Sequence, residues 1–110
     1  YPAHAQRLYK VEGSSLNKAV QDGSYIHAID VMAADITPTP GDLVVVQRKR
    51  HGTVEYTAKR YLVEDGKQIL RPESDDPMWQ DDVVIDGDDE TETVISDIAI
   101  VEWKSLKRLR

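Results

Sequence analysis

Turn dipeptides divide this chain of 110 residues into short segments. Five pairs that end in glycine lie at intervals along it: Asp22-Gly23, Pro40-Gly41, His51-Gly52, Asp65-Gly66 and Asp86-Gly87. Such pairs mark tight turns, because glycine adopts positive φ at no steric cost. The segments between them are about 8–20 residues long, too short for several helices, and are rich in Val, Ile, Thr and Tyr. The sequence therefore predicts a mainly β domain with little helix.

Runs of β-branched and aromatic residues predict about seven short strands in twisted antiparallel sheets. The predicted strands are Leu8–Glu12, Ser24–Ile29, Leu43–Lys49, Val54–Glu64, Gln68–Arg71, Val83–Ile85 and Thr93–Trp103. A turn at Arg50–Thr53 is expected to join two of them into a hairpin. For Gly13–Val20, a loop and a single helical turn both remain open. Residues 1–110 are assigned to one domain, because a chain of this length is too short for two separate cores.

The last predicted strand, Thr93–Trp103, is apolar on both sides. Strict alternation divides its apolar side chains between two faces. These two sets are Val94, Ile98 and Ile100 on one face, and Ile95, Ala99, Val101 and Trp103 on the other. A strand that is covered on both faces lies either in the interior of a sheet or at a contact between subunits. Both alternatives stay open.

The composition excludes several kinds of functional site. The chain has no cysteine, which rules out disulfides, thiolate zinc sites, iron–sulfur clusters and thiol nucleophiles. Its three histidines, His4, His27 and His51, are far apart, and it has no glycine-rich phosphate motif, so we expect no metal and no cofactor. A net charge of −6 makes the domain a poor partner for nucleic acid. No apolar run is long enough to predict a transmembrane helix.

Five short motifs follow one another through most of the chain. In order they are Val11-Glu12-Gly13-Ser14-Ser15-Leu16, Val20-Gln21-Asp22-Gly23-Ser24, Pro40-Gly41-Asp42-Leu43-Val44-Val45-Val46, Thr57-Ala58-Lys59-Arg60 and Leu70-Arg71-Pro72-Glu73-Ser74. With this order and spacing the chain resembles the C-terminal peptidase domain of the LexA and phage-repressor family of Ser–Lys self-cleaving proteins, whose members include lambda repressor-like and UmuD-like proteins. The resemblance extends from about Tyr9 to Val101, and it implies the mainly β peptidase fold of that family.

The resemblance implies a role for individual residues. Ser15 falls on the nucleophile of the family and Lys59 on its general base. Gly13 falls on the glycine that lets the chain turn before the nucleophile, and Leu16 stands where the family usually has Met. Ser14 leaves an ambiguity of one position, but alignment through Leu16 favours Ser15 as the nucleophile.

The chemistry of a hydroxyl and an amine is consistent with this assignment. A serine hydroxyl is a weak nucleophile until a base takes its proton, and lysine serves as that base in known variants of the catalytic triad. A free lysine is almost fully protonated at pH 7, so its side chain must be buried to act as a base. Period two places Lys59 with Thr57, Tyr61 and Val63 and without an adjacent acidic residue, since Glu55 is two pairs away. We therefore expect a buried Lys59 with a lowered pKa.

Supporting groups are predicted around this pair. Thr57 is a candidate to orient the amine of Lys59. Backbone N–H groups around Ser15 are expected to form the oxyanion hole, and Gly13 allows the tight turn that this requires. No side-chain donor for the oxyanion can be assigned from the sequence.

The resemblance also implies partners. Proteins of the family form homodimers and cut an Ala-Gly or Cys-Gly bond in their own linker, stimulated by the RecA filament on single-stranded DNA in the SOS response, in the bacterial cytoplasm. This chain contains neither dipeptide and begins at Tyr1 without a Met. We therefore expect the cleavage linker upstream of Tyr1, together with the DNA-binding domain through which operator DNA is bound. No membrane partner is expected.

Two other interpretations remain open. In the first, the same fold serves as a non-cleaving dimerisation module of a repressor, with a Ser–Lys pair that is not used. In the second, the chain is a different Ser–Lys relative, either a UmuD-like polymerase accessory subunit or a protein similar to signal peptidase. The absence of a membrane anchor from the sequence disfavours the signal peptidase.

Overall fold

The computed structural model describes residues 3–11, 23–74, 80–85 and 91–103. They form a short 3-10 helix and seven strands: η1 (Ala3–Ala5), β1 (Gln6–Lys10), β2 (Tyr25–Asp30), β3 (Leu43–Arg50), β4 (Thr53–Glu64), β5 (Lys67–Arg71), β6 (Val83–Ile85) and β7 (Thr91–Trp103). The prediction of a mainly β chain with about seven strands and little helix is confirmed. The sequence did not predict η1, and the segment Gly13–Val20 lies outside the described residues. Within these ranges, no helix has the length and apolar character needed to cross a membrane.

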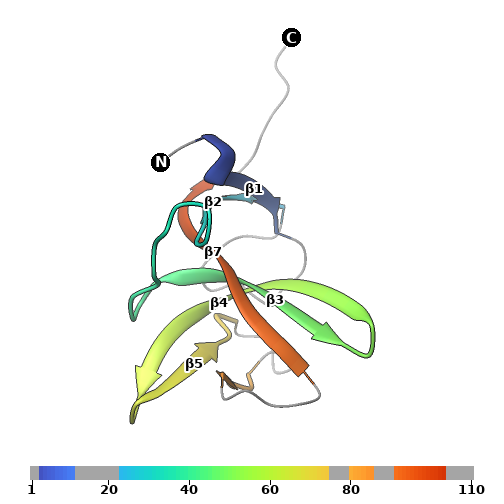
Figure 1. Cartoon of the computed structure of the whole chain (residues 1–110), viewed down its shortest axis with the longest axis vertical. Helices are drawn as coiled ribbons and strands as arrows, with labels where there is room; N and C mark the ends of the chain where they lie inside the picture. Colours follow the sequence, from blue (N-terminus) through green and yellow to red (C-terminus); the bar gives the residue numbers. More distant parts are fainter. Residues whose placement is uncertain (1–2, 12–22, 75–79, 86–90, 104–110) are drawn as a thin grey trace.

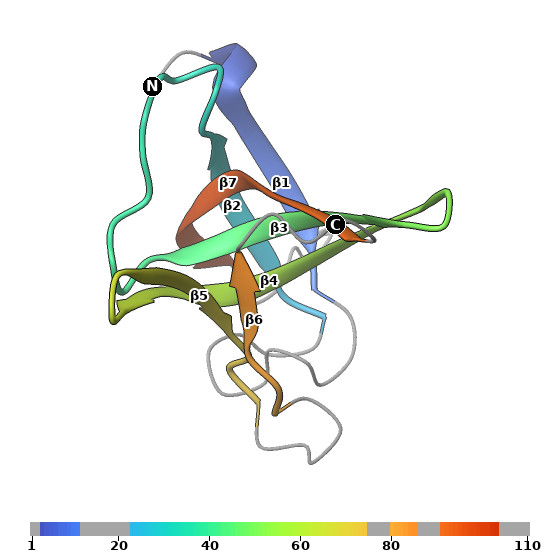
Figure 2. The same ribbon diagram turned by 60° about the horizontal axis from the view of Figure 1, so that its bottom comes forward.

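All seven strands belong to one antiparallel sheet, where the sequence predicted more than one sheet. The strand order is β1-β2-β7-β3-β4-β5-β6, and Figure 2 shows β6 beside β5 at one edge. The long strand β7 lies between β2 and β3, pairing with β3 through its first half and with β2 through its second half (Figure 1). The predicted interior position of this strand is therefore confirmed, and a subunit contact through its exposed Val94 and Ile100 stays a prediction.

Two tight turns fix the register of the strands around Lys59. The β3–β4 turn has φ values of 49° at His51 and 79° at Gly52, and the β4–β5 turn has 52° at Asp65 and 75° at Gly66. Positive φ at both central residues defines the type I′ turn, whose twist matches that of the flanking strands. The β3–β4 turn places Lys59 opposite Val44.

Strand β1 begins and ends two residues earlier than predicted, at Gln6–Lys10 in place of Leu8–Glu12. Its side chains are mostly exposed, so an alternating apolar pattern does not mark its start. Pairing with β2 defines it instead, since Gln6 lies opposite Ile29 and Lys10 opposite Tyr25. The bounds of the other six strands agree with the predicted ones to within two residues.

The centre of β3 supplies side chains to both faces of the sheet. Val44 and Val46 are fully buried in a first cluster, with Tyr61 and Leu70. Val45 points to the opposite face and belongs to a second cluster, with Ile26 and Ala28. A strand that is buried on both faces accounts for the continuous apolar run in this part of the sequence.

A β-bulge in β7 overturns the predicted division of its side chains between two faces. Val46 pairs with Ile95 and Val45 with Asp97, which leaves Ser96 as the extra residue. Because the bulge shifts the alternation by one, Ile95 and Ile98 both pack against the first cluster. Strict alternation had placed these two residues on opposite faces.

Candidate functional site

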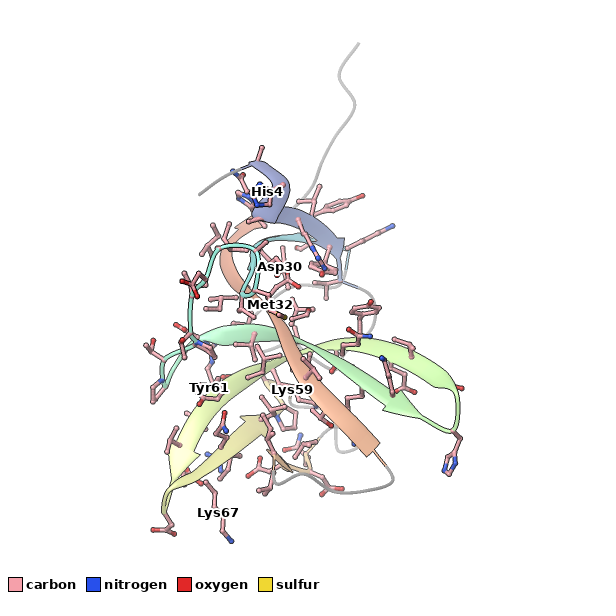
Figure 3. The ribbon with its side chains drawn as sticks, viewed as in Figure 1. His4, Asp30, Met32, Lys59, Tyr61 and Lys67 are labelled. Atoms are coloured by element: carbon pink, nitrogen blue, oxygen red, sulfur yellow. The ribbon has the colours of Figure 1, made fainter. Side chains whose placement is uncertain are left out.

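Lys59 is buried in the middle of β4. Only 7% of its surface is exposed, and Tyr61, two positions further along the same face, is equally buried. Figure 3 shows both residues on this strand. The fully buried Val44 lies directly opposite Lys59 in β3. The predicted burial of Lys59 is therefore confirmed.

The environment of Lys59 disfavours its charged form. Burial is the main cause that lowers the pKa of its amine, and the positive charge of Arg48 lowers that pKa further. Asp82 acts in the opposite direction and is the weakest of the three influences. The amine makes no hydrogen bond or ion pair with any residue that the structure describes. A lysine with a lowered pKa and no carboxylate partner is better suited than an exposed lysine to accept a proton.

Asp82 is the one acidic influence on Lys59 among the described residues, and the sequence analysis missed it. Arg71 donates to its carboxylate at 2.8 Å and 3.0 Å, and also contacts Glu64 at 3.2 Å. Arg71 is the main cause that lowers the pKa of Asp82. Because Asp82 directly precedes β6, and is thus two strands away from β4 in the sheet, alternation along β4 could not reveal it.

Thr57 and Arg48 lie on the same face of the sheet as Lys59. Thr57 Oγ1 is buried and has no hydrogen-bond partner among the described residues, so it does not bond the amine of Lys59 in this structure. Its role in orienting that amine stays a prediction. Arg48 Nε is likewise buried without a partner within the described ranges. The register of β3 against β4 could have indicated Arg48, since period two places it on the face of Val44.

Segments from three of the sequence motifs meet at β4 next to Lys59. Gly41 donates its N–H to the carbonyl of Tyr61 at 2.7 Å, and Tyr61 donates its own N–H to the carbonyl of Asp42 at 2.8 Å. Arg60 binds the carbonyl of Gly41 at 2.9 Å through Nη1 and the carboxylate of Glu73 at 2.7 Å through Nε. These bonds fix the backbone on which Lys59 is carried.

The other predicted catalytic residues, Ser15, Gly13 and Leu16, lie outside the described residues. Their segment joins β1 to β2, and the residues at its two ends are bonded together. Val11 donates its N–H to the carbonyl of Ser24 at 2.8 Å, and Gly23 donates to the carbonyl of Val11 at 2.8 Å. The pairing of Ser15 with Lys59 stays a prediction.

A second polar cluster lies where β1, β2 and β7 meet. Asp97 is fully buried, and its Oδ1 accepts hydrogen bonds from Tyr9 at 2.8 Å and from Ser96 at 2.5 Å. Arg7 lies 3.8 Å from the same oxygen and also pairs with Asp30. Burial is the main cause that raises the pKa of Tyr9, which keeps its hydroxyl protonated as a donor. The cluster holds β1, the strand before the segment of Ser15, against the interior of the sheet.

Removing the donor from this cluster is expected to destabilise the domain. A Tyr9→Phe variant leaves the buried carboxylate of Asp97 with one partner fewer, which should lower the free energy of unfolding by about 1–3 kcal/mol. Urea unfolding measures this change. Tyr56→Phe is the matched control, because Tyr56 is 55% exposed and should tolerate the same change within about 0.5 kcal/mol. Equal effects of the two substitutions would contradict a structural role for the Tyr9 bond.

No arrangement of three or more His, Cys, Asp or Glu side chains that could hold a metal ion occurs in the described parts of the chain. Comparison of the sequence with protein-family models gave no match, and neither did a search of curated proteins. The interpretation of the site consequently depends on the five motifs and on the environment of Lys59.

Proposed function

We propose that this chain is the autoproteolytic and dimerisation domain of a LexA-like repressor of phage or bacterial origin. In this proposal Lys59 is the general base, and Ser15 is the nucleophile that cuts a peptide bond in the protein's own upstream linker. The observation that carries the proposal is the burial of the Lys59 side chain, which is only 7% exposed, together with the lowered pKa that this burial causes and the lack of a hydrogen-bond partner among the described residues. A lysine that only supported the fold would be expected to reach solvent or a carboxylate.

The reaction is an acyl transfer in two steps. The neutral amine of Lys59 takes the proton of the Ser15 hydroxyl while Oγ attacks the carbonyl carbon of the scissile bond. The resulting ammonium gives this proton to the leaving nitrogen, the C–N bond breaks, and an acyl-serine ester remains. Water then attacks the ester, with Lys59 again as base. The proton returns to Ser15, and a carboxylate product is released.

The rigidity of β4 supports this role for Lys59. Catalysis requires that the base be held within a fraction of an ångström of its working position. Arg60 and Tyr61, the two residues that follow Lys59, are bonded to the Gly41–Asp42 turn, and Arg60 also binds Glu73. The motifs that carry the family resemblance are thus the segments that brace this part of β4.

The proposal includes the partners that the resemblance implies. The domain forms a homodimer in the bacterial cytoplasm and cleaves itself in response to the RecA filament on single-stranded DNA, as part of the SOS response. Operator DNA is bound through an upstream domain. Cleavage separates the DNA-binding domains from the dimer, and two tethered domains bind DNA far better than one. Self-cleavage therefore switches the repressor off.

A Ser15→Ala variant of the full-length repressor tests the proposal. Self-cleavage should fall by at least about a thousandfold, because the nucleophile of a dyad cannot be replaced by a neighbouring group. Gel electrophoresis of the fragments, with and without the RecA filament, measures the rate. Ser14→Ala is the matched control and should leave cleavage within about twofold, which also settles the ambiguity of one position. Slow cleavage of the unaltered protein that neither substitution changes would show a non-cleaving dimerisation module instead.

A further inference from the structure

Arg48, Thr57 and Lys59 share one face of the sheet, next to the buried hydrophobic side chains of the first cluster. Thr57 and Lys59 are two positions apart on β4 and so point to the same side. Arg48 belongs to that side as well, since it lies two positions beyond Val46, which pairs with Thr57. Val44 and Val46, which lie opposite Lys59 and Thr57 on the same face, are buried residues of the first cluster.

All three side chains lack hydrogen-bond partners among the described residues. Arg48 Nε and Thr57 Oγ1 are buried atoms without one, and the amine of Lys59 has neither a hydrogen bond nor an ion pair in the same ranges. Buried polar groups in proteins are nearly always bonded, so each exception requires an explanation. The other described arginine side chains have polar partners, because each of Arg7, Arg60 and Arg71 contacts a carboxylate.

The unused groups are donors. A guanidinium Nε–H, a hydroxyl and, when Lys59 is protonated, an ammonium group together provide five donor hydrogens and two positive charges. The complement to such a set is an oxyanion with several acceptor sites. Asp82 does not fill this role, because its carboxylate is bonded to Arg71.

We propose that Arg48, Thr57 and Lys59 form a carboxylate-binding site, and that its occupant is the C-terminal carboxylate released by peptide cleavage. This inference rests on the proposed function for the identity of the occupant, whereas the site itself does not require Ser15. In this proposal Arg48 and Thr57 bind the cleavage product next to Lys59, the general base.

Occupancy of the site and catalysis by Lys59 are mutually exclusive. A bound carboxylate stabilises the ammonium form of Lys59, and an ammonium cannot take a proton from serine. Linkage makes the relation reciprocal: a lower pH charges Lys59 and tightens carboxylate binding, while a higher pH frees the base and weakens binding. The cleaved product therefore inhibits the site that made it.

The other charged groups around Lys59 do not cancel this pH dependence. Glu55 lies opposite Arg48 in register but is exposed to solvent, and Asp82 stays ionised beside Arg71, which lowers its pKa. The side chains of β7 that pack on this face, Ile95 and Ile98, carry no charge. Lys59 is therefore the group whose protonation couples to the carboxylate.

An NMR titration of the isotope-labelled chain with N-acetylglycine tests the site. N-acetylglycine carries the carboxylate of a peptide C-terminus, and its amide, N-acetylglycinamide, is the uncharged control. Saturable shifts are expected at the Nε–H of Arg48 and along β3 and β4, with N-acetylglycine and not with the amide. Arg48→Met should weaken binding about ten- to hundredfold, the effect of a lost charged hydrogen bond. Lys49→Met, which removes the adjacent exposed charge on the other face of β3, should change it less than about twofold.

The outcomes separate this site from general electrostatic attraction. Equal losses in Arg48→Met and Lys49→Met, or inorganic phosphate that binds as tightly as N-acetylglycine, would overturn a specific carboxylate site. Should Arg48→Met not fold, Thr57→Val decides, since it removes one donor at constant shape; unchanged binding in that variant contradicts the proposal. If the chain binds N-acetylglycine but the full-length protein does not cleave itself, the carboxylate-binding site is supported and the cleavage product is refuted as its occupant. Cleavage without binding would refute the site alone.

Discussion

Replacing Lys59 with methionine is expected to abolish self-cleavage and, at the same time, to stabilise the domain. Methionine has a similar length and an apolar, flexible side chain that fills the same space beside Val44 and Tyr61. The substitution removes an amine on a largely buried side chain, where its charged form is disfavoured. Loss of the base should reduce cleavage by at least about a thousandfold.

The gain in stability should depend on pH in a defined direction. The pKa of Lys59 is lowered in the folded state, so between that lowered value and its ordinary value of 10.5 the unfolded chain binds more protons than the folded one. Stability then rises with pH across this window, and the penalty of burying Lys59 is fully present below it. The advantage of Lys59→Met should therefore be largest below the lowered pKa and disappear as the pH approaches 10.5.

Urea unfolding of both proteins at a series of pH values measures this difference. Lys67→Met is the matched control, because Lys67 is an exposed lysine on the neighbouring strand β5 and its loss should leave stability within about 0.5 kcal/mol at every pH (Figure 3). The cleavage rate of the unaltered protein should rise with pH through the same lowered pKa. A loss of stability in Lys59→Met that is independent of pH would show that Lys59 is a structural residue, and its role as a base would be refuted.

The sequence was sufficient for the hairpins and for the face of Lys59. His51-Gly52 and Asp65-Gly66 are turn pairs with a physical mechanism, and a turn of two residues fixes the register of both adjoining strands. Once the register is fixed, period two determines which side chains of β4 share a face. These two local rules gave the face of Lys59, whereas its predicted burial came from the base role that the family resemblance implies.

Two irregularities of β7 could not be predicted from these rules: the bulge at Ser96 in its pairing with β3, and a second register shift at Ile100 in its pairing with β2. An extra residue in one strand shifts its alternation by one, but the sequence of β7 contains no glycine or other signal that marks the position. The bulge places Ile95 and Ile98 in one cluster, and it brings Asp97 to the opposite face, where it meets Tyr9. The buried carboxylate network could thus not be found from the sequence.

The charges that surround Lys59 were missed for a different reason. Arg48 and Asp82 come from β3 and from the residue before β6, and their influence depends on tertiary distances. The register of the hairpin places Arg48 on the face of Lys59, but local patterning gives neither the distance between the two charges nor the approach of Asp82 from two strands away. The assignment of Lys59 as a base needs both kinds of information, since its pKa depends on burial and on neighbouring charge.

Truncation of Leu70 is expected to produce the largest loss of stability among the single substitutions considered. Leu70 in β5 is fully buried in the first cluster and lies opposite Tyr61 in β4. A Leu70→Ala variant loses the burial of several methyl and methylene groups and leaves a cavity, which costs about 2–5 kcal/mol in well-packed cores. Domains of this size are stable by about 5–15 kcal/mol, so this loss is a large fraction of the free energy of unfolding. The variant should therefore unfold at a lower temperature.

The same substitution should alter the chemistry of Lys59, because Leu70 belongs to the cluster that buries this face of β4. Weaker packing admits water, which reduces the main cause of the lowered pKa, and the pH profile of self-cleavage should then shift toward alkaline values. Thermal unfolding and the cleavage rate against pH measure the two effects. Val63→Ala, at the exposed end of β4, is the control. It should change neither the thermal stability nor the pH profile of cleavage by much. A destabilised Leu70→Ala with an unchanged pH profile would show that the first cluster supports the fold without setting the basicity of Lys59.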